Sequence, residues 1–128
     1  MIREYVVIGD ALMMHERHMI ETGGGSGVRD MGALEAALMR PQTGYYDDLI
    51  AEAAALWESM AQNHPFVDGN KRTAMSVVHT FLLINGVDFS QPDDAVWKWI
   101  LGSYDAKSFN FASIDGWLRA NTEPFQFD

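Results

Sequence analysis

Residues 73–84, which read TAMSVVHTFLLI, would be apolar on almost every face of a helix. Such a helix has to be covered by neighbouring elements, because no face of it can remain in water at low cost. It is predicted to begin near Gly69 or Asn70 and to end at Asn85–Gly86, where glycine adopts the left-handed closing conformation. The stretch is too short to cross a bilayer. The rest of the chain is therefore expected to surround it, with no membrane partner.

Apolar spacing and capping signals predict further helices on both sides of this segment. The run Gly23–Gly27 has to be a loop, and residues 87–89 suggest one short extended piece. Neither a sustained strand pattern nor a repeat is visible. The prediction is a compact all-α bundle around one buried central helix, with residues 1–128 as a single domain. The other helices are expected to open at Gly9 or Asp10, Asp30, Asp48, Pro92 and near Ser113, with Asp10, Asp30 and Ser113 as N-caps, and to end near Thr22, Leu38, Asn63, Ser103 and Leu118.

The composition limits the classes of protein to which this chain can belong. Apolar residues make up 48% of the 128 residues, which is enough for a packed core. The absence of cysteine excludes disulfides and cysteine-held metal centres. A formal net charge of −9 argues against sequence-independent binding to duplex nucleic acid, which needs a basic surface. Because no targeting signal is recognisable, a cytoplasmic location without a direct nucleic-acid partner is expected.

The segment Asn63–Thr73, NHPFVDGNKRT, leads from a loop into the N-terminus of the apolar helix. A helix N-terminus offers unpaired N–H groups and the positive end of the dipole, so it suits a phosphate. Gly69 lets the backbone approach an anion closely. Lys71 and Arg72 are adjacent cations at the end of a helix where cations are electrostatically unfavourable. The segment therefore predicts a phosphate-binding site.

Two further side chains of this segment have chemistry that suits a phosphate site. Asp68 is a hard oxygen donor, which fits Mg²⁺ when phosphates supply other ligands. His64 is the residue type best suited to act as a general base near neutral pH. The structural alternative is that His64 caps the preceding helix and that Asp68–Asn70 forms an ordinary turn.

The nine residues His64–Arg72, HPFVDGNKR, resemble the signature of the Fic/Doc superfamily. That signature is His-Pro-Phe-x-Asp/Glu-Gly-Asn-Gly/Lys-Arg, where x is any residue. The closer branch is the death-on-curing (Doc) toxins of toxin–antitoxin modules. The resemblance implies the helical Fic fold over most of the chain. The other matching segments are Gly27–Asp30, Leu34–Leu38, Arg40–Pro41 and Thr73–Gly86.

The resemblance implies a role for each polar residue of the signature. His64 would take the proton from a Ser, Thr or Tyr hydroxyl of a target protein, and Asp68 would hold Mg²⁺ against the phosphates of ATP. Asn70 and the backbone of Gly69 would cradle phosphate oxygens, and Arg72 would neutralise charge as the bond breaks. Positioning and electrostatic stabilisation of this kind supply most of the catalysis in phosphoryl transfer.

Lys71 distinguishes between two reactions of the superfamily. Members that transfer AMP usually have glycine at this position, whereas Doc-type toxins have lysine. The lysine implies that ATP binds in the reverse orientation and presents its γ-phosphate. The expected activity is thus that of a protein kinase toxin, for which the resemblance implies elongation factor Tu as the target and blocked translation as the result. AMP transfer is the alternative, and a catalytically inactive member that only binds a partner is a third interpretation.

The resemblance also implies regulation by a second protein. Many Fic proteins carry a self-inhibitory segment, Ser/Thr-x-x-x-Glu-Gly/Asn, which does not occur in this sequence. A cognate, Phd-like antitoxin that binds in trans through a helical segment is therefore expected. The family has a flap that docks the target, and residues 41–47 lie at its position. Tyr45 and Tyr46 could contribute to that docking or pack onto the core.

Several other side chains have both a structural and a functional interpretation. Arg29 could tie the glycine loop to the site or be a surface charge. His15, Glu16 and His18 could suggest a metal site, but the sequence places no further ligand beside them. Core positions rather than ligand contacts are expected for His79, Trp97, Trp99 and Trp117.

Overall fold

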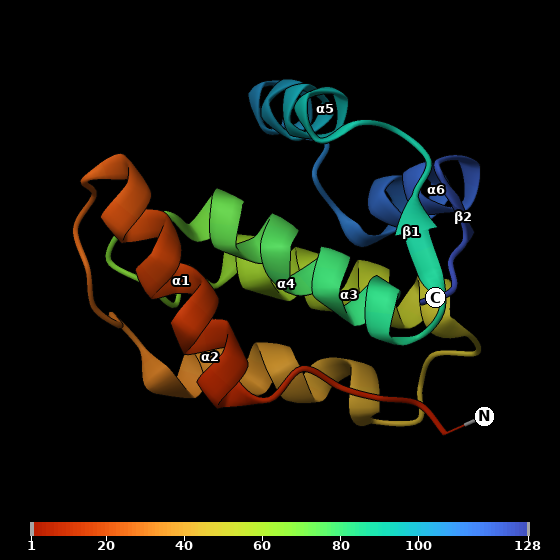
Figure 1. Cartoon of the computed structure of the whole chain (residues 1–128), viewed down its shortest axis with the longest axis horizontal. Helices are drawn as coiled ribbons and strands as arrows, with labels where there is room; N and C mark the ends of the chain where they lie inside the picture. The colour runs from red at the N-terminus through yellow and green to blue at the C-terminus, as the bar shows by residue number, and fades with distance from the viewer. Residues whose placement is uncertain (1, 128) are drawn as a thin grey trace.

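Six α-helices, one 3₁₀ turn and two short strands make up most of residues 2–127, the part of the chain that the computed structural model describes (Figure 1). The predicted all-α class is confirmed, since the strands form only a two-stranded antiparallel pair. Among these residues, no helix has the length and apolarity that a membrane crossing requires. The elements are α1 (Ile8–Thr22), α2 (Met31–Met39), η1 (Arg40–Gln42), α3 (Leu49–Gln62), α4 (Asn70–Ile84), β1 (Val87–Phe89), α5 (Asp93–Asp105), α6 (Phe111–Ala120) and β2 (Thr122–Pro124).

Asp30 and Asp48 open their helices as predicted. The carboxylate of Asp30 accepts a hydrogen bond from the backbone N–H of Ala33 at 3.0 Å, and Asp48 does the same with Ala51 at 2.9 Å. Each aspartate therefore satisfies one of the N–H groups that a helix N-terminus leaves unpaired. Gly86, with φ +84°, takes the left-handed conformation predicted after the apolar helix.

Two of the predicted N-caps are wrong. α1 begins at Ile8, so that Asp10 lies within the first turn, where a negative charge is favourable without capping. α6 begins at Phe111, and its cap is Asn110, whose side chain accepts from the backbone N–H of Ser113 at 3.0 Å. Asn110 and Ser113 are three residues apart and are both capable caps, so spacing alone did not distinguish them.

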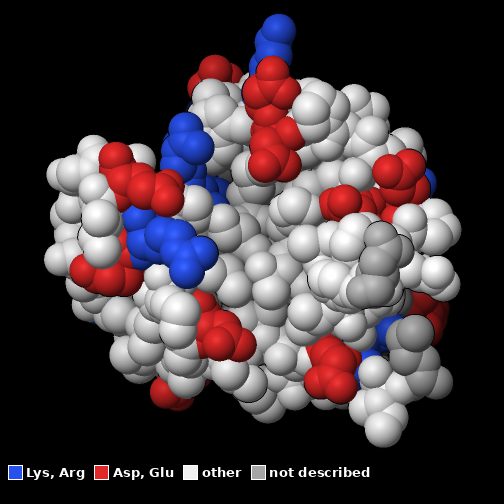
Figure 2. All heavy atoms as spheres, in the orientation of Figure 1, with Lys and Arg blue, Asp and Glu red and all other residues white. Residues whose placement is uncertain are grey.

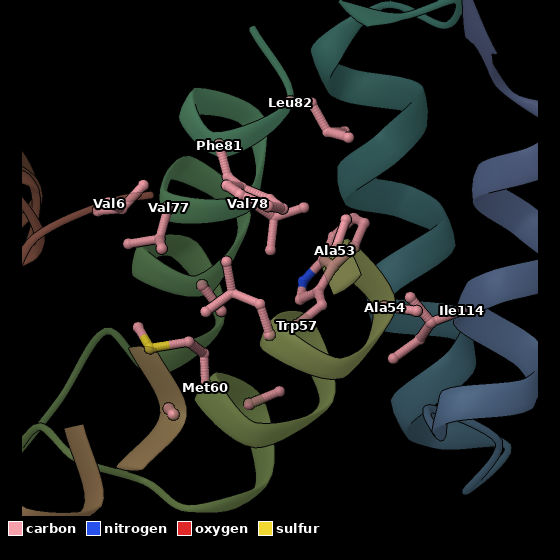
Figure 3. Close-up of a cluster of buried hydrophobic side chains, with 14 of the residues drawn as sticks. Val6, Ala53, Ala54, Trp57, Met60, Val77, Val78, Phe81, Leu82 and Ile114 are labelled. Atoms are coloured by element: carbon pink, nitrogen blue, oxygen red, sulfur yellow. The ribbon is translucent and has the colours of Figure 1, made fainter. Parts of the chain in front are cut away.

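The most deeply buried helix is α3 rather than α4, the helix for which the sequence predicted this place. α3 packs against α2, η1, α4 and α6, and its alanines at 53–55 allow these neighbours to approach closely. α4 packs against α1, α3 and β1, and its residues His79 and Ile84 remain partly exposed. Figure 3 shows Val78 of α4 on the side of Trp57 of α3, whereas Val77 lies on the side of Val6. α4 thus has more apolar residues than its neighbours bury.

A cluster of aromatic rings joins the C-terminal elements to α3. The Trp57 ring is fully buried and lies 5.5–6.2 Å, between ring centroids, from four rings contributed by β1, α5, α6 and the α5–α6 loop. Trp99 and Trp117 pack against the core as predicted, although each is only partly buried, and their rings stack at 4.2 Å within the cluster. The four neighbours of Trp57 are Phe89, Trp99, Phe109 and Trp117.

Arg119 of α6 binds the carboxylate that caps α3. Its two Nη groups donate to Asp48 Oδ1 and Oδ2, each at 3.0 Å, and this pairing holds the pKa of Asp48 below its usual value. Because the folded state lowers this pKa, the stabilisation is complete above the unfolded-state pKa and is lost as the pH falls through the folded-state value.

Asp48→Asn is expected to keep the helix cap but to lose the ion pair with Arg119. Both side chains are about half exposed, so the free energy of unfolding at pH 7 should fall by less than about 1 kcal/mol. The difference between the two proteins should shrink as the pH is lowered below about 4, because Asp48 is then protonated in the unfolded chain and, at still lower pH, in the folded chain. Urea unfolding at pH 7 and pH 3 measures both values. An equal difference at both pH values would contradict the assignment.

Candidate functional site

The loop between α3 and α4 is held in place by Arg29. Its Nε donates to the carbonyl of His64 at 2.6 Å, its Nη2 donates to the carbonyl of Asn63 at 2.8 Å, and its backbone N–H donates to the carbonyl of Pro65 at 2.8 Å. His64 has φ +47°, a left-handed conformation that costs a non-glycine residue about 1 kcal/mol. Of the two interpretations of Arg29, the structure supports the one in which it ties the glycine-loop side to the site.

Arg29→Ala is expected to loosen this loop. Loss of charge-assisted hydrogen bonds at an exposed position should make local opening easier by about 1 kcal/mol. Exchange of the Val67 amide, which donates to the Gly27 carbonyl at 3.2 Å, should then become about fivefold faster. Hydrogen exchange followed by NMR measures this, and Arg17→Ala, an exposed arginine on α1, is the matched control. Unchanged exchange in Arg29→Ala would contradict the proposed tether.

Asn70 closes the loop from the other end. Its amide accepts from the backbone N–H of Phe66 and donates to the carbonyl of Phe66, both at 3.0 Å. Phe66 is itself buried and forms an isolated antiparallel bridge with Val28. The Asn70 side chain therefore shapes the loop. One N–H and one lone pair of its amide, together with its backbone N–H at the start of α4, remain for a ligand in the pocket.

His15 supports the site through a contact that the sequence did not predict, since the residue was considered there only as a metal ligand. It is buried on α1, its Nε2 lies 2.8 Å from the carbonyl oxygen of Asp68, and its ring stacks on Phe66 at 3.8 Å. The sequence signal for this burial was the helical spacing of His15 and Met19, which places both on the apolar face of α1. His18 is bonded to Ser76 Oγ at 2.6 Å instead. Across residues 2–127, no three His, Asp or Glu side chains come together as a metal cluster.

The carboxylate of Asp68 is exposed and faces the glycine-rich loop. Its Oδ1 accepts from the backbone N–H of Gly69 at 2.8 Å, and its Oδ2 accepts from that of Gly25 at 3.3 Å. A Cβ at Gly24 would lie 2.8 Å from Asp68 Oδ2 and 2.9 Å from Met19 Sδ, so only glycine fits there without displacement. One accessible carboxylate is a donor set that suits Mg²⁺, which is usually held by one or two carboxylates, water and substrate phosphates.

Gly69 allows α4 to begin beside this carboxylate. It is the N-cap of α4 with φ +74°, and no side chain caps the helix. The first N–H groups of α4 are consequently available to an anion. A Cβ at Gly69 would displace the end of the Met19 side chain, but the positive φ is what favours glycine here.

The two cations at this end of α4 rest on aromatic rings of α5. Lys71 Nζ lies 4.6 Å from the ring centroid of Tyr104, and Arg72 Cζ lies 4.1 Å from that of Trp97. Burial raises the pKa of Tyr104 to about 12. Trp97 packs partly against the core, as predicted, but it also borders the site, which the prediction did not include.

These residues surround an open pocket of about 460 Å³. The candidate site residues of the segment 64–72 meet in this pocket. Tyr45 and Tyr46 do not line it: Tyr45 is exposed, and the hydroxyl of Tyr46 accepts a hydrogen bond from Arg40 Nε at 2.8 Å. Figure 2 shows most of the visible Lys and Arg atoms gathered on one side of the face drawn, among scattered acidic atoms. The pocket is lined by Met19, Thr22, Gly24, His64, Val67, Asp68, Gly69, Asn70, Lys71, Arg72 and Trp97.

A polar loop held between two helices, an uncapped helix N-terminus and adjacent cations define a site of the Fic type, and sequence comparison agrees. The profile of the Fic/DOC family matches residues 5–82, which is more than half of the chain, and the chain belongs to this family. The resemblance inferred from the segment 64–72 is confirmed, whereas α5 and α6 lie outside the matched residues.

Two relatives are similar to the chain over part of its length. It is 51% identical over 80 residues to "Toxin Doc" of Mycolicibacterium smegmatis, a match that covers 59% of this chain and 62% of that protein. It is 34% identical over 89 residues to "Protein kinase doc" of Escherichia phage P1, with 66% of this chain and 71% of that protein covered. The chain thus spans somewhat less than two thirds of the mycobacterial relative.

Proposed function

We propose that this chain is a Doc-like toxin of a type II toxin–antitoxin system that transfers the γ-phosphate of ATP to a hydroxyl of a target protein. The observation that carries the proposal is the pocket in which His64, Asp68 and the cations Lys71 and Arg72 meet at the uncapped N-terminus of α4. The name of the phage relative, a protein kinase, supports the same reaction class.

In the proposed reaction, His64 accepts the proton of the target hydroxyl. The hydroxyl oxygen forms a bond to the γ-phosphorus, while the bond from that phosphorus to the bridging oxygen breaks and its electron pair leaves with ADP. Arg72 and the N–H groups at the start of α4 neutralise the charge on the phosphate oxygens. The exposed position of His64 at the pocket suits contact with a second protein.

Asp68 is the residue proposed to hold Mg²⁺. Its carboxylate is accessible, and its two hydrogen bonds come from backbone N–H groups, which leave further lone pairs available. When bound, the cation would neutralise and orient the phosphates of ATP. His15 and Gly24 support this residue, because the first bonds its carbonyl and the second leaves room for its side chain.

Transfer of AMP is the second candidate, and the position of Lys71 favours keeping it. The ammonium of Lys71 rests on the Tyr104 ring, so the lysine does not have to occupy the space that glycine leaves open in AMP-transferring members. The two reactions use the same residues and differ in which phosphorus is attacked.

The deciding experiment is a transfer assay in a bacterial lysate with Mg²⁺ and ATP labelled at either the α- or the γ-phosphate. A protein labelled only from the γ position supports the kinase, and its mass would test whether the target is elongation factor Tu. Labelling from the α position would show AMP transfer instead. The absence of both, together with no rise in melting temperature at millimolar Mg–ATP, would support the interpretation as a non-catalytic binding protein.

Lys71→Gly is expected to separate the two reactions. If Lys71 orients ATP for γ-transfer, its loss should lower phosphorylation by at least about tenfold, because a misplaced reacting atom costs that much or more. An AMP transferase should change little. The same assay with both labels measures the outcome, and Lys98→Gly on α5, outside the pocket lining, controls for the loss of a charge.

A cognate antitoxin is proposed as the partner. The name Toxin Doc of the mycobacterial relative supports it, and a Phd-like protein bound in trans would supply the inhibition that the absent self-inhibitory segment does not. Blocked translation in the cytoplasm is the expected consequence of the reaction. Co-expression of the chain with a candidate antitoxin, followed by copurification, tests the partner.

A further inference from the structure

Trp97 and Tyr104 of α5 lie seven residues apart, two turns along the same helix, and each ring meets one cation of the pocket. The cations are held at the end of α4 where the helix dipole repels positive charge. Among residues 2–127, no carboxylate lies within ion-pair distance of Lys71 or Arg72. The rings therefore restrain the cations without neutralising them, which leaves their charge available to an anion.

Arg72 and Trp97 also form the wall between two pockets. Both residues line the pocket of about 460 Å³ and a second one of about 340 Å³ on the other side, which Asp93 and Asp94 border. An arginine side chain is long enough to reach either pocket, and the two carboxylates would attract it away from the first. The Trp97 ring, 4.1 Å below the guanidinium, opposes that movement.

We infer that Trp97 is a positioning residue that keeps the Arg72 guanidinium directed at the phosphate pocket and away from Asp93 and Asp94. The inference rests on the proposed function for its consequence in catalysis, but its geometry is independent of it. α5 lies outside the residues that the family profile matches, so this part of the site is contributed by the C-terminal portion of the chain. Figure 1 shows α5 along the edge of the bundle, set apart from the backbones of the other helices.

The first measurement is the NMR resonance of the Arg72 Nε–H group. The Trp97 ring should shift it upfield, Trp97→Phe should keep most of the shift, and Trp97→Leu should abolish it. Leu101→Ala, a partly exposed position on the same helix, is the control that should change nothing. The absence of an upfield shift in the unmodified chain would overturn the inference.

The second measurement is a double-mutant cycle of Trp97 and Arg72. The affinities for Mg–ATP and for inorganic tripolyphosphate are measured in a His64→Asn background, which prevents turnover. Trp97→Leu should weaken both affinities about three- to tenfold, which is the range expected for a partly exposed cation–π contact. Combined with Arg72→Gln, it should cause no further loss, because its effect acts through Arg72. The melting temperature should stay close to that of the parent.

The outcomes separate the inference from the proposed function. Equal losses with and without Arg72, or no loss at all, would overturn the role of Trp97 even if the parent transfers phosphate. Coupled losses of tripolyphosphate affinity in a chain that transfers nothing would support the role of Trp97 and contradict the proposed reaction. Failure of every protein, the parent included, to bind either anion would overturn both.

Discussion

His64→Asn is expected to lower the rate of phosphate transfer by about 10²–10⁴-fold, the usual contribution of a general base. Asparagine is the preferred substitute because His64 has φ +47°, and asparagine tolerates the left-handed region better than alanine does. The fold and the affinity for Mg–ATP should persist, since the contacts of His64 recorded in the loop come from its backbone carbonyl, which asparagine retains. The rate is measured with γ-labelled ATP and the identified target.

A matched control exists elsewhere in the chain. Lys107 also lies in the left-handed region, with φ +56°, and is exposed beyond the end of α5. Lys107→Asn should therefore change the stability as little as His64→Asn does, and it should cause no loss of phosphate transfer. Transfer at the parent rate by His64→Asn would contradict the assignment of His64 as the base, whatever the control shows.

Trp57→Ala is expected to have the largest effect on stability. The ring is fully buried among four other aromatic rings, and replacing such a residue by alanine lowers the free energy of unfolding by about 3–5 kcal/mol. The free energy of unfolding of a typical domain is about 5–15 kcal/mol, so Trp57→Ala should remove much of the stability. Urea unfolding followed by circular dichroism measures the change.

Two variants test whether the loss comes from the ring itself. Trp57→Phe should cost less than half as much, because it keeps an aromatic ring and removes an indole N–H that has no partner among the described residues. Leu101→Ala, partly exposed on α5, should change the free energy of unfolding by less than about 0.5 kcal/mol. A loss below about 1 kcal/mol in Trp57→Ala would contradict the cluster as a stability centre.

The parts of the site that could be predicted are those built from neighbours in the chain. His64, Asp68, Gly69, Lys71 and Arg72 lie within nine residues, and a loop followed by a helix brings them to one place by local geometry alone. The caps at Asp30 and Asp48 were predictable for the same reason, since a capping bond joins residues three apart.

The role of Asn70 was not predictable in this way. The resemblance implied that Asn70 helps to cradle phosphate oxygens, and the structure adds that both polar atoms of its amide bond the backbone of Phe66. The burial of α4 was overestimated as well, because an apolar sequence shows what a helix can bury and not which neighbours will cover it. α3, with its small alanines, takes the central position instead.

The helices, the caps at Asp30 and Asp48 and the reactive segment could be predicted from the sequence, because they depend on spacings of a few residues. Tertiary structure alone decided that Arg29 holds the His64 carbonyl, that His15 bonds Asp68, and that Trp97 lies under Arg72. These contacts join residues between 25 and 53 positions apart. Such distances are bridged only when whole helices pack, and the packing is set by the volume and burial of many side chains together rather than by any local pattern.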